Sequence, residues 1–239
     1  MLAHVISDIG LVRETNEDSY VCSPPHLFIV ADGMGGHVAG EIASKLAVKT
    51  VNGYIQEHVG KDNLELLLKQ AIIQANTSIY QMALSKEDFS GMGTTVTAVY
   101  IDGKKLHWGH VGDSRIYLLR KGELRQITND HSLVWELVQS GSITREDAQN
   151  HPKRNILTRA VGTSCLISVD TGTLSLETGD VVLMCTDGLT NMVSEEEIYK
   201  LIQRKDCDPS SIVEQLVLQA KNAGGFDNIT TILLKEEDA

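Results

Sequence analysis

The chain has 239 residues, and its 32 Asp and Glu against 21 Lys and Arg give a formal net charge of -11. This balance excludes a nucleic-acid-binding protein that relies on a clustered basic surface. The excess acid either keeps the protein in solution or supplies carboxylates that gather around metal cations, and composition alone favours the first reading.

The first third of the chain predicts one buried strand and two long helices. Residues 27–31 form a short apolar run that reads as a strand entering a turn at Asp32-Gly33. The spacing then becomes helical from residue 40 to about 58, and again from about 63 to 84. The apolar stripe of the second helix consists of Leu64, Leu67, Leu68, Ala71, Ile72, Ala75 and Ile79.

The middle of the chain changes to a period of two. Residues 94–101, 106–111, 115–119 and 123–127 predict an antiparallel meander, with a hairpin turn at Asp102-Gly103. Residues 131–151 return to helical spacing, broken at Gly141 and stopped by Pro152.

The last third predicts strands at 167–174 and 181–185, two helices and a final strand at 229–234. Ser194 and Glu197 form a capping box for a helix through residue 203. Ser210 or Ser211 opens the last helix, which closes near Gly224-Gly225. No Pro-rich linker or internal repeat interrupts the chain, so we expect one domain of α+β class with helices covering sheets.

The four cysteines include no C-x-x-C pair, which argues against a zinc cage or a redox pair. The N-terminus lacks the basic and apolar segments of a signal peptide, and no apolar run approaches the length of a membrane span. These features predict a protein of the reducing cytoplasm.

Four aspartates stand beside predicted strands: Asp32, Asp113, Asp187 and Asp227. Aspartates at strand ends can converge on one edge of a β core, where Mg²⁺ or Mn²⁺ would take their oxygens as ligands. The alternative is that each one simply begins a turn. The set of four favours the metal site without settling it.

Two further segments admit two readings each. The glycine-rich turn from Gly33 to Gly36 lets backbone approach a ligand, and His37 after it is a proton donor, a metal ligand or a plain surface residue. Arg13 beside Glu17 and Asp18 either grips a phosphate or belongs to an exposed charged turn.

Together these motifs resemble the metal-dependent protein phosphatases of type 2C. The matching segments, in the order of that family, are Arg13-x-x-x-Glu17-Asp18, Ala31-Asp32-Gly33-Met34-Gly35-Gly36-His37, Met92-Gly93-Thr94-Thr95, Val111-Gly112-Asp113-Ser114-Arg115, Thr186-Asp187-Gly188-Leu189 and Asp227-Asn228-Ile229-Thr230. The resemblance extends from about residue 6 to residue 234, and residues 139–162 resemble the flap of the bacterial members.

The resemblance implies a four-layer α-β-β-α sandwich, in which two antiparallel sheets are flanked by helices, plus a small flap subdomain at about residues 140–162. It also implies hydrolysis of phosphoserine and phosphothreonine in proteins by water shared between two divalent cations, Mn²⁺ or Mg²⁺. Asp32 would bridge both cations, and Asp187 and Asp227 would complete the first site. The carbonyl of Gly33 would serve the second, with Glu17 or Asp18 acting directly or through water. A third cation would take Asp113 and Asp187.

For the remaining residues the resemblance implies supporting roles. Arg13 would hold the phosphate, His37 would protonate the leaving oxygen, and Asn228 would orient Asp227. In many eukaryotic members the acid histidine directly follows the Asp-Gly pair, whereas this chain has Met34 there.

The flap and the partners complete the expectations. Lys153, Arg154 and Arg159 either steer phosphorylated loops toward the metals or, in the case of Arg159, hold the flap together. The resemblance implies a monomer that opposes a eukaryotic-like serine/threonine kinase, and neither nucleic acid nor a membrane is an expected partner.

Two other functions compete with this interpretation. A scaffold that has lost catalysis would be expected to lack a metal aspartate. A phosphatase of small phosphate esters remains a rival because fold does not determine substrate.

Overall fold

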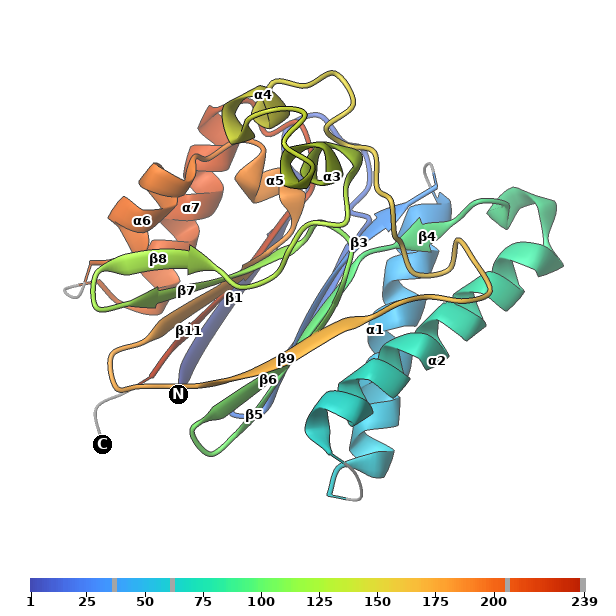
Figure 1. The fold of residues 1–239 in the computed structure, drawn as a ribbon, viewed down its shortest axis with the longest axis horizontal. Coiled ribbons are helices and arrows are strands. Elements are labelled where there is room, and N and C mark those ends of the chain that lie inside the picture. The colour runs from blue at the N-terminus through green and yellow to red at the C-terminus, as the bar shows by residue number, and fades with distance from the viewer. Residues whose placement is uncertain (36–37, 61–62, 205–206, 237–239) are drawn as a thin grey trace.

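The computed structural model describes residues 1–35, 38–60, 63–204 and 207–236. In this part of the chain two antiparallel sheets stack face to face, and helices cover the outer face of each (Figure 1). The predicted α-β-β-α sandwich is therefore confirmed.

The first sheet has the strand order β2-β3-β5-β6-β9, with the short β4 paired to the end of β3. Its strands are β2 (Asp18–Ser23), β3 (Leu27–Met34), β4 (Gly93–Thr94), β5 (Val96–Asp102), β6 (Lys105–Val111) and β9 (Asp170–Ser175). Helices α1 (Val38–His58) and α2 (Leu64–Ser85) lie against its outer face, and a short 3-10 turn (Glu87–Phe89) follows them.

The second sheet has the strand order β1-β11-β10-β7-β8. Its strands are β1 (Leu2–Asp8), β7 (Arg115–Arg120), β8 (Glu123–Gln126), β10 (Val181–Cys185) and β11 (Ile229–Lys235). Helices α6 (Glu195–Ile202) and α7 (Pro209–Asn222) cover it, and the single turn α5 (Asp187–Thr190) sits at one end of β10.

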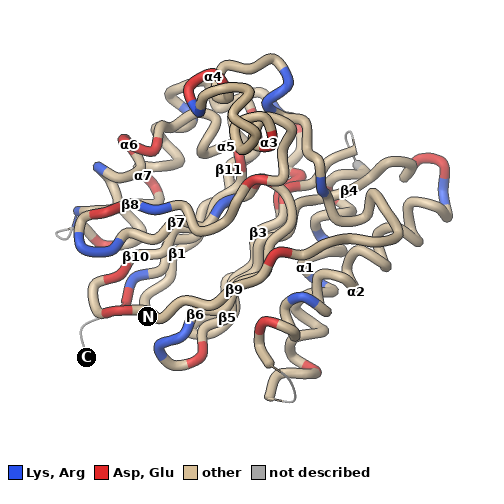
Figure 2. The backbone as a smooth tube through the Cα atoms, in the orientation of Figure 1, with Lys and Arg blue, Asp and Glu red and all other residues tan. Residues whose placement is uncertain are grey.

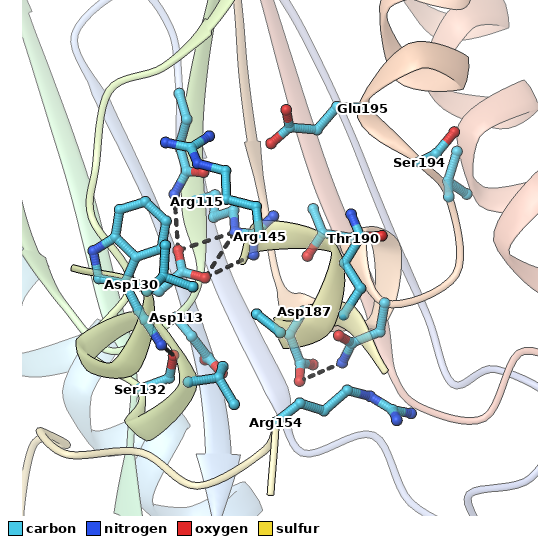
Figure 3. Close-up of a pocket in the computed structure, with 18 of the residues that line it drawn as sticks. Asp113, Arg115, Asp130, Ser132, Arg145, Arg154, Asp187, Thr190, Ser194 and Glu195 are labelled. Carbon is cyan, nitrogen blue, oxygen red and sulfur yellow. Dashed lines mark hydrogen bonds and ion pairs between the residues drawn. The ribbon is translucent and has the colours of Figure 1, made fainter. Parts of the chain in front are cut away.

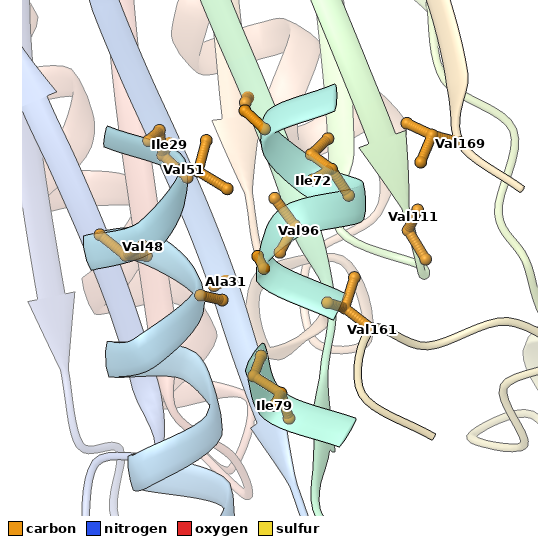
Figure 4. Close-up of a cluster of buried hydrophobic side chains, with 14 of the residues drawn as sticks. Ile29, Ala31, Val48, Val51, Ile72, Ile79, Val96, Val111, Val161 and Val169 are labelled. Carbon is orange, nitrogen blue, oxygen red and sulfur yellow. The ribbon is translucent and has the colours of Figure 1, made fainter. Parts of the chain in front are cut away.

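The central strands β3, β10 and β11 are apolar on both faces because each face is buried in a different layer. In β3, Leu27, Ile29 and Ala31 pack under α1 and α2 (Figure 4), whereas Phe28 and Val30 point into the space between the sheets. In β10 the alternation repeats, with Leu183 toward α6 and α7 and Met184 between the sheets. This period of two is that of a strand, and it explains why the runs contain so few polar residues.

Two expectations about the strands are wrong. The predicted meander is divided, since β5 and β6 belong to the first sheet while β7 and β8 belong to the second. Asp32 and Gly33 do not begin a turn but continue β3, and Gly33 pairs with Thr94. A side chain on Gly33 would lie 2.1 Å from the carbonyl oxygen of Gly40, so only glycine lets β3 pass so close to α1.

The helix ends follow the capping chemistry. Asn63 caps α2 and Ser194 forms the expected capping box with Glu197. The last helix, however, begins at Pro209 with Asp208 as its cap, one to two residues before the predicted serines, because Asp is as good a cap and Pro suits the first helical position. The strand predicted at 167–174 begins only at Asp170.

The segment from 133 to 161 contains the helices α3 (Leu133–Gln139) and α4 (Arg145–Gln149), separated at Gly141 as expected. Backbone bridges join Ser132 to Leu157 and Thr94 to Val161, so the segment leaves and returns at the same end of the sheets. The buried Asn76 of α2 secures the return: its amide oxygen accepts from the Gly162 N–H at 2.7 Å and its amide nitrogen donates to the Ser164 carbonyl at 2.9 Å.

Replacing Asn76 with Ala should therefore lower the free energy of unfolding by about 1–3 kcal/mol, because the Gly162 N–H and the Ser164 carbonyl lose their partner. Denaturant unfolding measures the change. Gln74→Ala, at an exposed position of the same helix, serves as the control and should stay within about 0.5 kcal/mol of the wild type. Equal effects of the two substitutions would contradict the role given to Asn76.

Candidate metal centre

Five aspartates meet where the two sheets end near α5. Asp18 opens β2 directly opposite Asp32 of β3, and Asp113 lies in the turn between β6 and β7. Asp187 begins α5 after β10, and Asp227 precedes β11. In Figure 2, acidic positions are drawn in red, and several lie beside the end of β3. The strand-end aspartates predicted from sequence thus come together, and they do so from both sheets.

Burial and mutual repulsion raise the pKa values of four of these carboxyls, those of Asp18, Asp32, Asp113 and Asp187. Desolvation is the main cause, and it raises the pKa of Asp18 to about 7, with Asp187 and Asp227 adding repulsion. The same causes raise the pKa of Asp32 and Asp113 well above the usual range, and that of Asp187 as well. Such a cluster is unfavourable when ionised unless a positive charge enters it.

The hydrogen bonds of the cluster leave oxygens free. Thr186 donates to Asp18 Oδ2 at 2.9 Å, and Asn191 donates to Asp187 Oδ2 at 2.9 Å. The Oδ1 atoms of Asp18 and Asp187 are buried without a hydrogen-bond partner. Within the described residues, no three or more His, Cys, Asp and Glu side chains are arranged to hold one ion. An all-oxygen donor set with orphaned, negatively charged atoms fits Mg²⁺ or Mn²⁺.

Glu17 and Gly33 are held beside the cluster by backbone contacts. The Gly33 N–H donates to the Glu17 carbonyl oxygen at 3.1 Å, and the Glu17 side chain is buried. A Cβ on Gly40 would lie 1.9 Å from Glu17 Oε2, which shows how closely α1 approaches this carboxyl. The structure thus brings Glu17 and Gly33 to the same place as the aspartates.

Arg13 and Asn228 organise the Asp227 side of the site. Arg13 Nη2 donates to Asp227 Oδ2 at 2.8 Å, while the arginine side chain stays about half exposed. Asn228 is buried, and its amide joins three backbone groups: Oδ1 accepts from the Glu17 N–H at 2.8 Å, and Nδ2 donates to the Ile9 and Thr15 carbonyls at 3.0 Å. The side chain therefore secures the loop that carries Arg13, and only the backbone N–H of Asn228 donates to Asp227, at 2.9 Å from Oδ1.

Sequence reasoning gave no role to the histidine that supports Asp113. The Gly112 N–H donates to His131 Nδ1 at 3.0 Å, so the ring proton is on Nε2, which donates to Asp170 Oδ2 at 3.2 Å. Burial lowers the pKa of His131, although the hydrogen bond to Asp170 opposes it, and the ring stays neutral near pH 7. The signal in the sequence that could have found it is the polar segment Asp130-His131-Ser132.

A cavity of about 390 Å³ opens beside Asp113 and Asp187 (Figure 3). Its opposite wall comes from α3, α4 and the loop after α4, where the Arg145 guanidinium lies 5.1 Å from the centre of the Trp135 ring. Arg115 and Asp130 form a close ion pair, with Nη2 and Oδ2 2.7 Å apart, in the same wall. The cavity is therefore bounded by the aspartates on one side and by the 133–161 segment on the other.

The predicted flap cations have different surroundings. Arg154 lines the cavity, whereas Lys153 is exposed and does not line it. Arg159 Nη1 pairs with Asp170 Oδ1 at 2.7 Å, which ties the segment to β9 and, through Asp170, to His131. His37 lies outside the described residues.

Comparison with known proteins decides the family. The model of the family described as "Protein phosphatase 2C" matches residues 13–233. The chain belongs to the protein phosphatase 2C family. Family membership confirms the resemblance stated from the motifs.

Relatives of this phosphatase cover its whole length. The serine/threonine phosphatase stp of Listeria monocytogenes is 40% identical over 99% of this chain and 96% of its own length. The structure of the Mycobacterium tuberculosis serine/threonine phosphatase PstP/Ppp has a TM-score of 0.92 and 38% identity, and the match covers 99% of each chain. A PstP catalytic domain solved with two manganese ions has a TM-score of 0.90 and 37% identity over 99% of this chain and 98% of that one.

Among the helices that the structure describes, none has the length and apolar character needed to cross a membrane.

The carboxylate cluster predicts a pH-dependent need for metal. Folded Asp18 keeps its proton up to about pH 7, whereas the unfolded carboxyl loses it near 3.8. The folded state therefore binds more protons in this range, and the free energy of unfolding of the metal-free phosphatase falls as pH rises through it. Melting temperatures in EDTA should decrease from pH 5 to pH 8, and saturating Mn²⁺ should raise them most at pH 8.

Asp18→Asn is the matched variant, because it removes one ionisable group and should reduce the decrease seen in EDTA. A melting temperature that is independent of both pH and Mn²⁺ would count against a native metal site.

Asn228→Ala should weaken Mn²⁺ binding by about 10–100-fold, because the amide that positions the Arg13 loop and the Glu17 backbone is lost. Isothermal titration with Mn²⁺ measures the affinity. Asn222→Ala, at an exposed position near the end of α7, is the control and should bind as the wild type does. Unchanged affinity in Asn228→Ala would show that the loop is held by other contacts.

Proposed function

We propose that this phosphatase hydrolyses phosphoserine and phosphothreonine side chains of proteins in a reaction that depends on Mn²⁺ or Mg²⁺. The observation that carries the proposal is the convergence of Asp32, Asp187 and Asp227 beside Arg13, at the open end of the sandwich. The names of its relatives support the substrate class, and the manganese-bound PstP domain supports the metal.

In this proposal Asp32, Asp187 and Asp227 hold two cations together with the Gly33 carbonyl and with Glu17 or Asp18, and Asp113 with Asp187 offers a third position. The bound cations would supply an acidified water and neutralise phosphate charge. The residues themselves position the reaction, because phosphoryl transfer needs orientation and charge compensation more than covalent help.

Arg13 is the residue that would grip the phosphoryl group. Its guanidinium uses Nη2 for Asp227, and about half of the side chain faces solvent, which leaves N–H donors for phosphate oxygens. The pairing with Asp227 also fixes the direction in which those donors point. His37 stays the proposed donor of a proton to the leaving oxygen.

The cavity wall suggests where the rest of a protein substrate lies. Arg154 lines the cavity next to Asp187, so among the predicted flap cations it is the one we propose to contact substrate. Arg159 is engaged by Asp170, and we assign it to holding the segment in place. Lys153 is exposed, and we propose that its charge steers phosphorylated loops of the substrate toward the site from a longer distance.

The proposed setting is the cytoplasm of a bacterium, where a monomer of this phosphatase would oppose a eukaryotic-like serine/threonine kinase. The four free cysteines agree with a reducing compartment. The family membership and the bacterial relatives support the pairing with a kinase of that class.

The test is phosphate release from a phosphothreonine peptide with Mn²⁺ and with EDTA. Asp187→Ala should reduce turnover by about a hundredfold or more, because a cation that stabilises the transition state loses a ligand. Asp102→Ala, at the exposed last residue of β5, is the control and should retain wild-type turnover. No turnover by folded wild-type protein with any divalent metal would overturn the proposal.

A further inference from the structure

A group of exposed apolar side chains lies in the two segments that carry Arg13 and Asp227. Its members come from the loop after β1 and from the turn between α7 and β11. They are Ile9, Leu11, Val12 and Phe226, with exposed fractions of 38%, 63%, 58% and 59%. Exposed apolar side chains that occur singly need no explanation, but a group of them beside a catalytic centre marks an interaction site.

The two segments form one surface because the turn between α7 and β11 contains two glycines. The Leu11 N–H donates to the Gly225 carbonyl at 2.8 Å. A Cβ on Gly225 would lie 3.0 Å from the Leu11 side chain, and one on Gly224 would lie 2.5 Å from the Phe226 ring. Leu11 thus packs against Gly225 and Phe226 against Gly224. The φ angles of these glycines, 52° for Gly225 and 131° for Gly224, are positive, and other residues rarely adopt such values.

The patch is held in a fixed position relative to the site. Asn228 donates to the carbonyls of Ile9 and Thr15, which lie at the two ends of the loop that carries Leu11 and Val12. Arg13 follows Val12 directly, and Asp227 follows Phe226 directly, and these two neighbours are joined by an ion pair of 2.8 Å. Because Val12 and Phe226 are the sequence neighbours of this ion pair, residues that flank a phosphorylated side chain held at Arg13 would lie beside the patch.

We propose that this patch docks apolar side chains of the phosphoprotein that flank the phosphorylated residue, and so selects substrates by sequence. The inference rests on the proposed function, because it needs a phosphoryl group on Arg13. A second copy of the chain fits the patch poorly, since a stable dimer needs about 20–30 residues from each partner and the patch offers four.

The experiment compares two phosphothreonine peptides of equal length and charge, one with Leu and Phe beside the phosphothreonine and one with Ser and Gly there. The wild type should show the lower KM for the apolar peptide. Leu11→Ser combined with Phe226→Ser should raise that KM by about five- to thirty-fold, which is the scale expected when one or two apolar contacts are lost. Turnover of p-nitrophenyl phosphate, which is too small to reach the patch, should not change.

Leu84→Ser is the matched control, because Leu84 is 71% exposed at the end of α2 and lies outside the patch. It should leave both KM values at the wild-type level. Equal KM values of the wild type for the two peptides, or an unchanged KM in the double variant, would overturn the docking role. A dimer in the wild type that the double variant loses would also overturn it, by giving the patch to a second copy. Failure of the wild type on p-nitrophenyl phosphate as well as on peptides would instead contradict the proposed function.

Discussion

The repulsion among buried carboxylates is the constraint around which this phosphatase is built. Asp18 is buried, Asp32 and Asp187 are half-buried near it, and desolvation together with mutual repulsion raises the pKa of each. Such an arrangement costs folding free energy, so the remainder of the chain must hold it together. The three apolar layers, one between the sheets and one under each pair of helices, supply that stability.

The two sheets are joined at the site by short polar contacts rather than by apolar packing. Thr186, at the end of β10 in the second sheet, donates to Asp18 of β2 in the first sheet and accepts from the Thr230 N–H of β11. Asn228 makes a similar connection between the start of β11 and the Glu17 backbone. These hydrogen bonds fix the distance between carboxylates that come from different sheets. Apolar packing is non-directional, so by itself it would not fix the position of one sheet relative to the other.

Local sequence signals were enough to predict most helices and strands. They failed where the structure depends on pairing between segments that are distant in the sequence. The stripe from Leu64 to Ile79 and the capping box at Ser194 depend on neighbours in sequence, so their helices were predicted closely. The division of β6 and β7 between two sheets depends on which strand pairs with which, and turn residues carry no such information.

The same distinction applies to the site. The aspartates were predicted because motifs place them at strand ends, and the family resemblance grouped them. The continuation of β3 through Asp32 and Gly33 was missed because it needs the close approach of Gly40, which only the packed structure reveals. The patch of Leu11 and Phe226 was missed for a similar reason: the two residues are more than 200 positions apart, and each alone looks like an ordinary exposed residue.

The origin of the aspartates in both sheets has a consequence for folding order. Asp32 and Asp227 are separated by most of the chain, and they meet only after β11, the last strand, has inserted between β1 and β10. Contacts of such long sequence separation form late, after loop-closure entropy has been overcome. A cation held by both residues, as proposed, would therefore bind after the sandwich has formed, and it would slow the unfolding rate while leaving the folding rate nearly unchanged.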